Sequence, residues 1–437
     1  MKPTVPQQTD PSILTLEKPV YGGSCLAHVE GKAVFVPLTL PGEQVSVRFT
    51  ESKSAYATAE VVEILSPSAD RVSPPCPHFG ACGGCNYQHI AYPTQLAFKQ
   101  AILRETLERG GVTVPGEIAV LSGNPLEYRN RIRLAFDSDG NPGYRGRGSH
   151  AVIPVRECPI AAPALMQAAL TFAETARAVA PNLKPTEIAL FTNADQSALL
   201  LTVTAAEVLK VPFEELAQTL KKRLPALKSA ELVLEAEEGR QPRIVAQWGS
   251  KSLLYRAAGF DYRVDHGAFF QVNRWLVDKL VETVLADAKG ALAWDLYAGV
   301  GLFARQLTKR FSQVIAVESA PASAEALAVN LKGTRGAPVR SSTLDFLRRP
   351  QAKGNTTPGV PDLIVVDPPR TGLGADTTKL LGKLAAPALV YVSCDPATLT
   401  RDLAALIASG YAVHSVTLAD QFPQTFHLET VVHLRRA

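Results

Sequence analysis

The stretch Asp295-Leu296-Tyr297-Ala298-Gly299-Val300-Gly301 joins an apolar run to a helical one and carries two closely spaced glycines. Glycine permits a tight turn and lets a ligand approach the backbone closely. Seventeen residues beyond Gly301 comes Glu318, at the end of the next apolar run. A carboxylate there can accept hydrogen bonds from both hydroxyls of a ribose. The pattern therefore indicates a site for a nucleoside cofactor.

The glycine turn does not choose the nucleoside. The dinucleotide fingerprint carries a third glycine, where this chain has Ala304. A nicotinamide or flavin dinucleotide, and a turn that binds no ligand, both stay open at this point.

Working outward from this turn, apolar strands alternate with helical segments from about residue 260 to residue 437. The strand-like runs read AWDLYAG, QVIAVES, DLIVVDPP, ALVYVSC, YAVHSVTL and LETVVHLRR. Such alternation predicts a doubly wound, Rossmann-like α/β domain with its ligands at the carboxyl ends of the strands.

Asp367-Pro368-Pro369-Arg370 follows one of these strands. Methyltransferases of this architecture often place such an Asp-Pro-Pro beside the methyl donor and the target base, and proline stiffens the loop. Asp367 is expected to orient the base or the donor; capping a turn is the alternative.

Cys394 ends another strand, and Asp395-Pro396 behind it fits the start of a helix. A helix N-terminus favours a thiolate. A thiolate that adds to carbon 6 of uracil makes carbon 5 nucleophilic, and a base must then remove the carbon 5 proton. Glu429, returned by the last loop, is the candidate base. A buried filler cysteine and a solvated glutamate are the alternatives.

The preceding chain divides into two further regions. Residues 10–67 contain alternating strands broken by YGG, VEGK and LPGE turns, which predicts a small β-barrel. A proline-rich linker leads into residues 68–259, an α+β region that opens with a helix at AYPTQLAFKQAILRETLERGG.

Three cysteines crowd into this linker region, and a fourth lies far along the chain. They are Cys76, Cys82, Cys85 and Cys158. Four thiolates suit tetrahedral zinc as well as a 4Fe-4S cluster. Cys25, in the barrel, is expected to be structural.

Composition excludes several classes of protein. Charged residues make up 20% of the 437-residue chain and apolar ones 46%, which argues against extensive disorder. No apolar run is long enough for a membrane span, and MKPTVPQQTDPS lacks the apolar region of a signal peptide. We expect a cytoplasmic protein, no membrane partner, no disulfide framework and a monomer.

Together these motifs resemble the RNA uridine-5-methyltransferase family, of the type with an N-terminal TRAM domain and an iron-sulfur cluster. The resemblance covers nearly the whole chain. It implies S-adenosylmethionine as cofactor, Cys394 as nucleophile and Glu429 as proton acceptor. It also implies 4Fe-4S at the four cysteines and an OB-like TRAM barrel. The implied donor-binding residues are Gln271 (in Phe270-Gln271-Val272-Asn273), Tyr297, Glu318, Asp367 and, as a looser match, Asp345.

One position departs from the family pattern. Many members have asparagine after the glycine turn, and this chain has Leu302. A polar contact to the donor is therefore expected to be missing.

The partner implied is RNA, with 23S ribosomal RNA favoured and transfer RNA as the alternative. Net charge is only +4, so the RNA contact must be local. Arg129, Arg131 and Arg133 alternate, which predicts one phosphate-binding face. The target uridine is expected to be flipped from its stack, supported by Phe269, Phe270 or Phe426. A non-catalytic RNA-binding protein and a cluster-dependent oxidoreductase are the competing readings.

Overall fold

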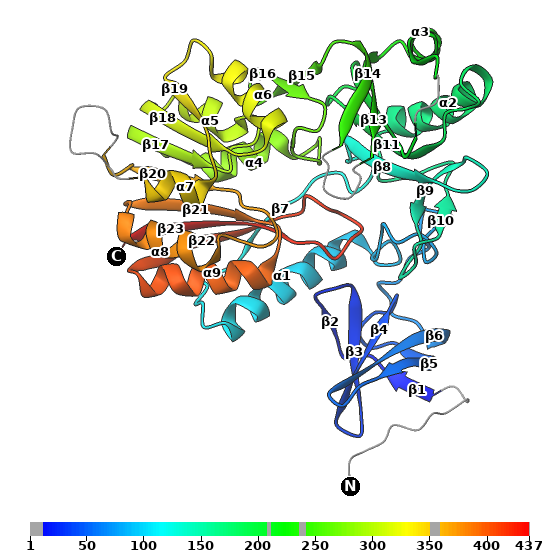
Figure 1. Cartoon of the computed structure of the whole chain (residues 1–437). Helices are drawn as coiled ribbons and strands as arrows, with labels where there is room; N and C mark the ends of the chain where they lie inside the picture. The colour runs from blue at the N-terminus through cyan, green and yellow to red at the C-terminus, as the bar shows by residue number, and fades with distance from the viewer. Residues whose placement is uncertain (1–11, 208–210, 236–241, 350–358, 437) are drawn as a thin grey trace.

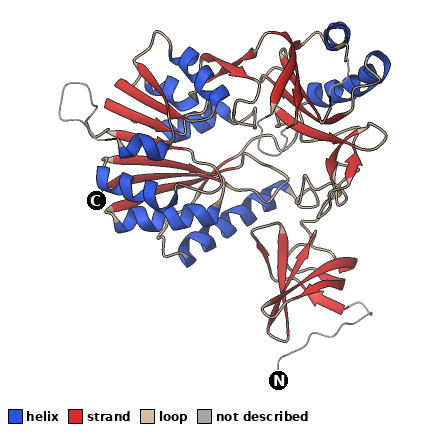
Figure 2. Ribbon diagram, in the orientation of Figure 1, coloured by secondary structure: helices blue, strands red, loops and turns tan. Residues whose placement is uncertain are grey.

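The computed structural model describes residues 12–207, 211–235, 242–349 and 359–436. Its strands form a small N-terminal sheet, a central sheet and a C-terminal sheet, with a short hairpin between the last two (Figures 1 and 2). Residues 1–11 lie outside the described residues. They include most of MKPTVPQQTDPS, in which no signal peptide is expected.

The N-terminal sheet has six strands in the order β1-β5-β6-β4-β3-β2. Its strands are β1 (Ser12–Thr15), β2 (Lys18–Val20), β3 (Ser24–Val29), β4 (Lys32–Pro37), β5 (Gln44–Ser52) and β6 (Tyr56–Ser66). Alternate side chains such as Val34, Val36, Val45 and Val47 fill one apolar core, as the period of two requires. Cys25 belongs to this core, and its Sγ lies 3.1 Å from the carbonyl oxygen of Thr39.

The central sheet has seven strands in the order β10-β9-β8-β11-β12-β13-β14. Its strands are β8 (Arg131–Phe136), β9 (Pro142–Arg145), β10 (Val152–Pro154), β11 (Pro185–Thr192), β12 (Leu199–Ala205), β13 (Leu227–Leu234) and β14 (Arg243–Gly249). Helices α2 (Pro163–Val179) and α3 (Phe213–Arg223) pack on it through one apolar core that includes Phe172 and Leu216.

The C-terminal sheet has eight strands in the order β19-β18-β17-β20-β21-β23-β22-β7. Its strands are β7 (Ala119–Leu121), β17 (Gly290–Leu296), β18 (Phe311–Glu318), β19 (Gly336–Arg340), β20 (Leu363–Val366), β21 (Ala388–Ser393), β22 (Tyr411–Ala419) and β23 (Glu429–Arg436). The strands from β19 to β21 pair in parallel, whereas β23 runs antiparallel to both of its neighbours. This arrangement confirms the doubly wound α/β architecture expected for this part of the chain.

Helices cover both faces of the C-terminal sheet (Figure 1). One face carries α4 (Val277–Leu285), α5 (Leu302–Leu307) and α6 (Pro321–Leu331). The other carries α1 (Tyr92–Arg109), α7 (Thr343–Arg348), α8 (Gly374–Leu384) and α9 (Pro396–Ala408). The β15 (Ser252–Ala257) and β16 (Phe260–Asp265) hairpin joins the core of the first face.

Helix α1 and strand β7 belong by packing to the C-terminal unit, although they precede the central sheet in sequence. Leu103 and Leu107 of α1 share an apolar core with the fully buried Trp294 of β17, and β7 pairs with β22. Residues from about 92 to 121, expected in the central region 68–259, therefore pack with the C-terminal sheet, α1 on its face and β7 at its edge. Local periodicity could not show this, because it does not reveal which core a helix joins.

Strand order reverses between β17 and β20, which are neighbours in the sheet. Ligands of doubly wound sheets bind outside the carboxyl ends of the strands at such a switch point. The glycine turn follows β17 and Asp367 follows β20, so both expected motifs lie there. Among the described residues, no helix is both long and apolar enough to cross a membrane.

Candidate active site

The turn after β17 is built from backbone that favours glycine. Tyr297, Gly299 and Gly301 all have positive φ, at 64°, 55° and 90°. A Cβ on Gly301 would lie 2.7 Å from Cδ1 of Leu327 in α6, so glycine also lets this helix pack closely. These three residues open the cleft by turning the chain away from the strand.

Glu318 is tied directly to this turn. Its Oε2 accepts a hydrogen bond from the Gly299 amide at 2.8 Å, and its Oε1 accepts from Ser319 and Ala320 at 2.7 and 2.6 Å. A carboxylate has about four lone-pair sites, so with three amides bound about one site stays free for a ribose hydroxyl. The carboxylate is thus fixed beside the glycine turn before any ligand binds.

Gln271 and Asp367 face each other across the cleft. The Gln271 amide donates from Nε2 to Oδ2 of Asp367 at 3.3 Å, and both side chains line the cleft with Gly299. Leu302 lines the same cleft and is only 6% exposed. An apolar side chain therefore stands where the family pattern has an amide.

The other two residues expected at the donor site are placed differently. The Tyr297 side chain hydrogen-bonds to Thr343 and Thr377, so it reaches α7 and α8 while its backbone forms the cleft. Asp345 is exposed in α7, where its Oδ2 accepts from Ser342 Oγ at 2.6 Å. Its carboxylate serves the helix cap, and a contact with the donor stays a prediction.

Cys394 lies between β21 and the N-terminus of α9, as the sequence indicated. Asp395 caps α9 by accepting from the Thr398 amide at 2.8 Å. The prediction of a thiolate, however, is wrong for the free protein. Burial and the carboxylates of Glu429 and Asp367 raise the pKa of the Cys394 thiol to about 12, although the charge of Arg370 lowers it. The helix terminus is outweighed because burial desolvates the thiolate and negative charge on the neighbouring acids disfavours a further one. The resting thiol is therefore neutral.

Glu429 and Asp367 form an interacting pair of acids beside this thiol. Burial, and then the charge of Asp367, raises the pKa of Glu429 well above its ordinary value, while Arg370 lowers it. Burial raises the pKa of Asp367 to about 7. Such a pair titrates as a unit, because one carboxylate disfavours ionisation of the other. The site therefore holds groups that can exchange protons near neutral pH.

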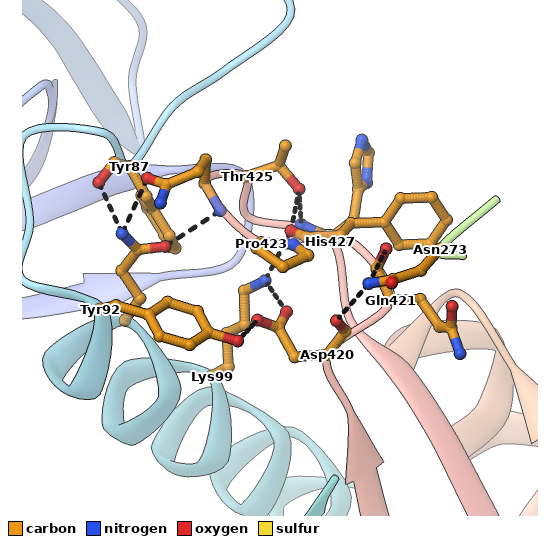
Figure 3. A network of polar contacts seen from close by, with 12 residues as sticks. Tyr87, Tyr92, Lys99, Asn273, Asp420, Gln421, Pro423, Thr425 and His427 are labelled. Atoms are coloured by element: carbon orange, nitrogen blue, oxygen red, sulfur yellow. Dashed lines mark hydrogen bonds and ion pairs between the residues drawn. The ribbon is translucent and has the colours of Figure 1, made fainter. Parts of the chain in front are cut away.

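The loop at residues 420–428 delivers Glu429, and buried polar contacts fix it (Figure 3). Lys99 of α1, fully buried, forms an ion pair with Asp420 at 2.6 Å and donates to the Phe422 carbonyl at 2.9 Å. Tyr92 donates to the other Asp420 oxygen at 2.8 Å. Gln95 is hydrogen-bonded to Gln424 through both its amide nitrogen and its oxygen.

The sequence reading missed these anchoring residues. Lys99 is a lysine at a buried position of an apolar-periodic helix, which is a signal because lysine is almost never fully buried without a partner. Arg370 was also passed over: it is exposed, yet its charge acts on Cys394, Glu429 and His427.

The aromatic residues expected to support a flipped base separate into three environments. Phe270 is 2% exposed and belongs to the apolar core, so it is not free to stack on a base. Phe269 is 55% exposed beside the glycine turn. Phe426 is half-buried, with its ring edge-on to Tyr21 at 5.4 Å.

The three arginines expected to form one phosphate-binding face differ in exposure, and only Arg133 is exposed. Arg131 donates to the Ala268 carbonyl at 2.7 Å and stacks on Phe191, whereas Arg133 pairs with Glu187 at 3.1 Å. Arg129 turns inward to a cavity formed by the cysteine residues. Alternation along a strand predicted a shared side, and only the packing of the central sheet decided that Arg129 and Arg131 are partly covered while Arg133 stays exposed.

The four cysteines expected to bind a metal line one cavity of about 240 Å³, together with Arg129, Tyr144 and His427. The Gly84 amide donates to the Cys82 sulfur at 3.4 Å, and the Tyr144 hydroxyl to the Cys158 sulfur at 3.9 Å. Among the described residues, no three His, Cys, Asp or Glu side chains converge as ligands of one metal ion. The thiols surround a space instead of meeting at a point.

The fold and the site define the class of protein. An archaeal tRNA (uracil-54, C5)-methyltransferase from Pyrococcus abyssi, solved with S-adenosyl-L-homocysteine, superposes with a TM-score of 0.76 over 96% of this chain and 99% of that one, at 23% identity. This chain therefore has a methyltransferase fold. A TRAM domain model matches residues 13–62, and a tRNA (Uracil-5-)-methyltransferase model matches residues 360–437.

Sequence relatives settle the family. The chain is 33% identical to a 23S rRNA (uracil(1939)-C(5))-methyltransferase from Halomonas elongata, over 94% of this chain and 87% of that protein. It is also 33% identical to an uncharacterized RNA methyltransferase from Streptomyces avermitilis, over 95% and 96%. The chain belongs to the RNA (uracil-5-)-methyltransferase family.

Proposed function

We propose that this protein methylates carbon 5 of a uridine in RNA, with S-adenosylmethionine as methyl donor and Cys394 as covalent nucleophile. The observation that carries the proposal is electrostatic: Cys394, Asp367 and Glu429 act on one another's ionisation at the edge of the sheet where the glycine turn lies. A thiol, a base and a nucleoside cleft are the groups that this reaction needs.

The reaction begins when the Cys394 thiol passes its proton to the Asp367–Glu429 pair and its sulfur bonds to carbon 6 of the uracil. The electrons of the carbon 5–carbon 6 double bond move into an enolate, and carbon 5 takes the methyl group. With the thiol proton held on Asp367, the Glu429 carboxylate then removes the carbon 5 proton and the carbon 5–carbon 6 double bond re-forms. The carbon–sulfur bond breaks as this happens, the leaving sulfur takes back its proton from Asp367, and Glu429 releases the carbon 5 proton to solvent. A base whose pKa is raised by burial holds that proton well.

S-adenosylmethionine supplies the methyl group as a sulfonium. The residues present fit its nucleoside part: Glu318 is held in place to accept a ribose hydroxyl, and Gly299 brings backbone close to the cleft. Gln271 and Asp367 complete the polar lining. The Tyr297 backbone contributes the turn, and Asp345 is the weakest assignment because its carboxylate caps α7.

Ribosomal RNA is the favoured substrate. The support is that relatives at 32–33% identity over more than nine-tenths of this chain are named 23S rRNA methyltransferases. Transfer RNA is the second candidate, because the solved neighbour of the same overall architecture acts on tRNA. We assign residues 10–67 to RNA binding, 260–437 to catalysis and 68–259 to the cysteine site and RNA contact, with residues 92–121 packed in the catalytic unit.

A 4Fe-4S cluster is proposed for Cys76, Cys82, Cys85 and Cys158. A zinc ion needs every sulfur at about 2.3 Å from one centre, whereas these thiols line a cavity with room for a larger group. Donors to sulfur and the nearby Arg129 suit an anionic cluster. Zinc is the alternative, and metal and acid-labile sulfide analysis of anaerobically purified protein separates the two. Equal iron and sulfide supports the cluster; stoichiometric zinc without sulfide contradicts it.

The activity test uses labelled S-adenosylmethionine with ribosomal and transfer RNA that lack modifications. We expect 5-methyluridine at one position, mapped by nuclease digestion and mass spectrometry, in ribosomal RNA. Product in transfer RNA alone would reassign the substrate. Absence of 5-methyluridine from both RNAs would refute the function.

A further inference from the structure

The TRAM domain touches both catalytic segments through one side chain, Tyr21. Its hydroxyl donates to Oδ2 of Asp395 at 3.3 Å, and its ring packs edge-on against Phe426 at 5.4 Å. Asp395 is adjacent to Cys394, and Phe426 lies in the loop that ends at Glu429. One residue of a separate domain therefore contacts the segments of the nucleophile and of the base.

The contact with Asp395 completes a defined geometry. One oxygen of this carboxylate, Oδ1, accepts from the Thr398 amide and caps α9, and the other, Oδ2, accepts from Tyr21. With both oxygens engaged, the carboxylate has one orientation. Because Asp395 follows Cys394 directly, this orientation also constrains the backbone that presents the thiol.

The TRAM turn itself is shaped for this approach. Tyr21 is followed by Gly22 and Gly23, both with positive φ, at 104° and 89°. A Cβ on Gly23 would lie 3.1 Å from Asn86 and 3.3 Å from Phe426, so only glycine lets the turn come this close without pressing on them. Tyr21 also packs against the apolar core of the catalytic sheet.

A second contact supports the same docking. Lys18 of β2 pairs with Glu105 of α1 at 2.6 Å, and α1 packs on the catalytic sheet. This pair is partly exposed and contributes little by itself. It shows that Tyr21 lies within a wider contact between the TRAM domain and the catalytic unit.

We propose that Tyr21 is a positioning residue through which the TRAM domain holds the Cys394 and Glu429 segments together for reaction. The TRAM domain then has two tasks: it binds RNA, and it completes the catalytic geometry. This inference rests on the proposed function and adds a residue that acts through Asp395 and Phe426.

The test measures attack by Cys394 separately from RNA binding. RNA that carries 5-fluorouridine should trap the adduct after methyl transfer, because fluorine replaces the proton that Glu429 removes. Tyr21→Phe removes only the hydroxyl. The hydrogen bond that is lost has a charged acceptor, and its loss should raise the activation barrier. We therefore expect adduct formation to slow about tenfold, with the Kd for RNA unchanged. Tyr21→Ala, which also loses the ring contact, should be slower still.

The matched control is Tyr56→Phe, a tyrosine in β6 of the same domain whose ring packs on Phe35. It should behave as the unmodified protein does, and equal melting temperatures should show that each variant is folded. An unchanged rate for Tyr21→Phe, or a loss of RNA affinity with an unchanged rate, would overturn the positioning role. If the unmodified protein forms no adduct, the proposed function itself fails.

Discussion

The donor cleft and the loop at residues 420–428 both take part in the proposed reaction, yet they are held in different ways. The backbone of the cleft depends on one short turn, with positive φ at residues 297, 299 and 301, and on Glu318, which ends the next strand and binds this turn. The loop depends on distant partners, since Lys99 and Gln95 of α1 and Tyr128 of the central region all bond to it. Local backbone conformation shapes the turn of the proposed cofactor cleft, whereas long-range polar contacts position the loop before Glu429.

The largest expected difference lies in the chemistry at the two catalytic segments. Cys394→Ala should lower methyl transfer at least about a thousandfold and form no adduct with RNA, because the nucleophile is gone. Glu429→Gln should instead accumulate the adduct, since its carbon 5 proton has no acceptor. Denaturing gels with labelled RNA measure both. Cys25→Ala, in the TRAM core, is the control; an adduct that persists in Cys394→Ala would place the nucleophile elsewhere.

Removal of the buried ion pair between Lys99 and Asp420 should destabilise the loop at residues 420–428. Lys99→Met leaves Asp420 buried without its cation, and we expect the free energy of unfolding to fall by about 3–5 kcal/mol. Lys18→Met, at a partly exposed ion pair between the TRAM domain and α1, should cost about 1 kcal/mol or less. Urea titration compares them. Equal losses would mean that the loop does not depend on this ion pair.

The pH dependence reports on the acids that the loop and the cleft bring together. Asp367 has its pKa raised to about 7, so its carboxylate accumulates only as the pH rises through that value. Single-turnover methylation should therefore increase about tenfold per pH unit below pH 7 and then level off. The raised pKa also means that the folded protein binds more protons than the unfolded chain between about pH 4 and 7, which makes stability fall as the pH rises there. A rate independent of pH would contradict this acid pair.

The smallest expected effect tests the cleft. Gly301→Ala combines a positive φ with a Cβ 2.7 Å from Leu327, whereas Gly22→Ala has a positive φ and open space. Backbone strain should cost each variant about 1–2 kcal/mol. Only Gly301→Ala should also raise the KM for S-adenosylmethionine, because α6 must shift beside the cleft. A matching rise in Gly22→Ala would show that this KM does not report on the cleft.

Both catalytic candidates could be found from the sequence, but the state of the nucleophile could not. The strand-to-helix position of Cys394 was visible in Cys394-Asp395-Pro396, and the structure confirms that cap. The helix terminus suggested a thiolate. The structure buries the sulfur beside Asp367 and Glu429, two residues far away in sequence, and these reverse the direction of the pKa shift.

The sequence by itself determined the family, the α/β architecture of the C-terminal region, the glycine turn and the grouping of Cys76, Cys82 and Cys85. Each of these follows from residues that lie close together in the sequence, and such local patterns set backbone conformation directly. Only the tertiary structure decided that α1 supports the loop before Glu429, that Arg131 of the arginine stripe turns inward and that Tyr21 reaches the helix cap beside Cys394. These features depend on which surfaces meet, and burial and charge act through space across any distance along the chain.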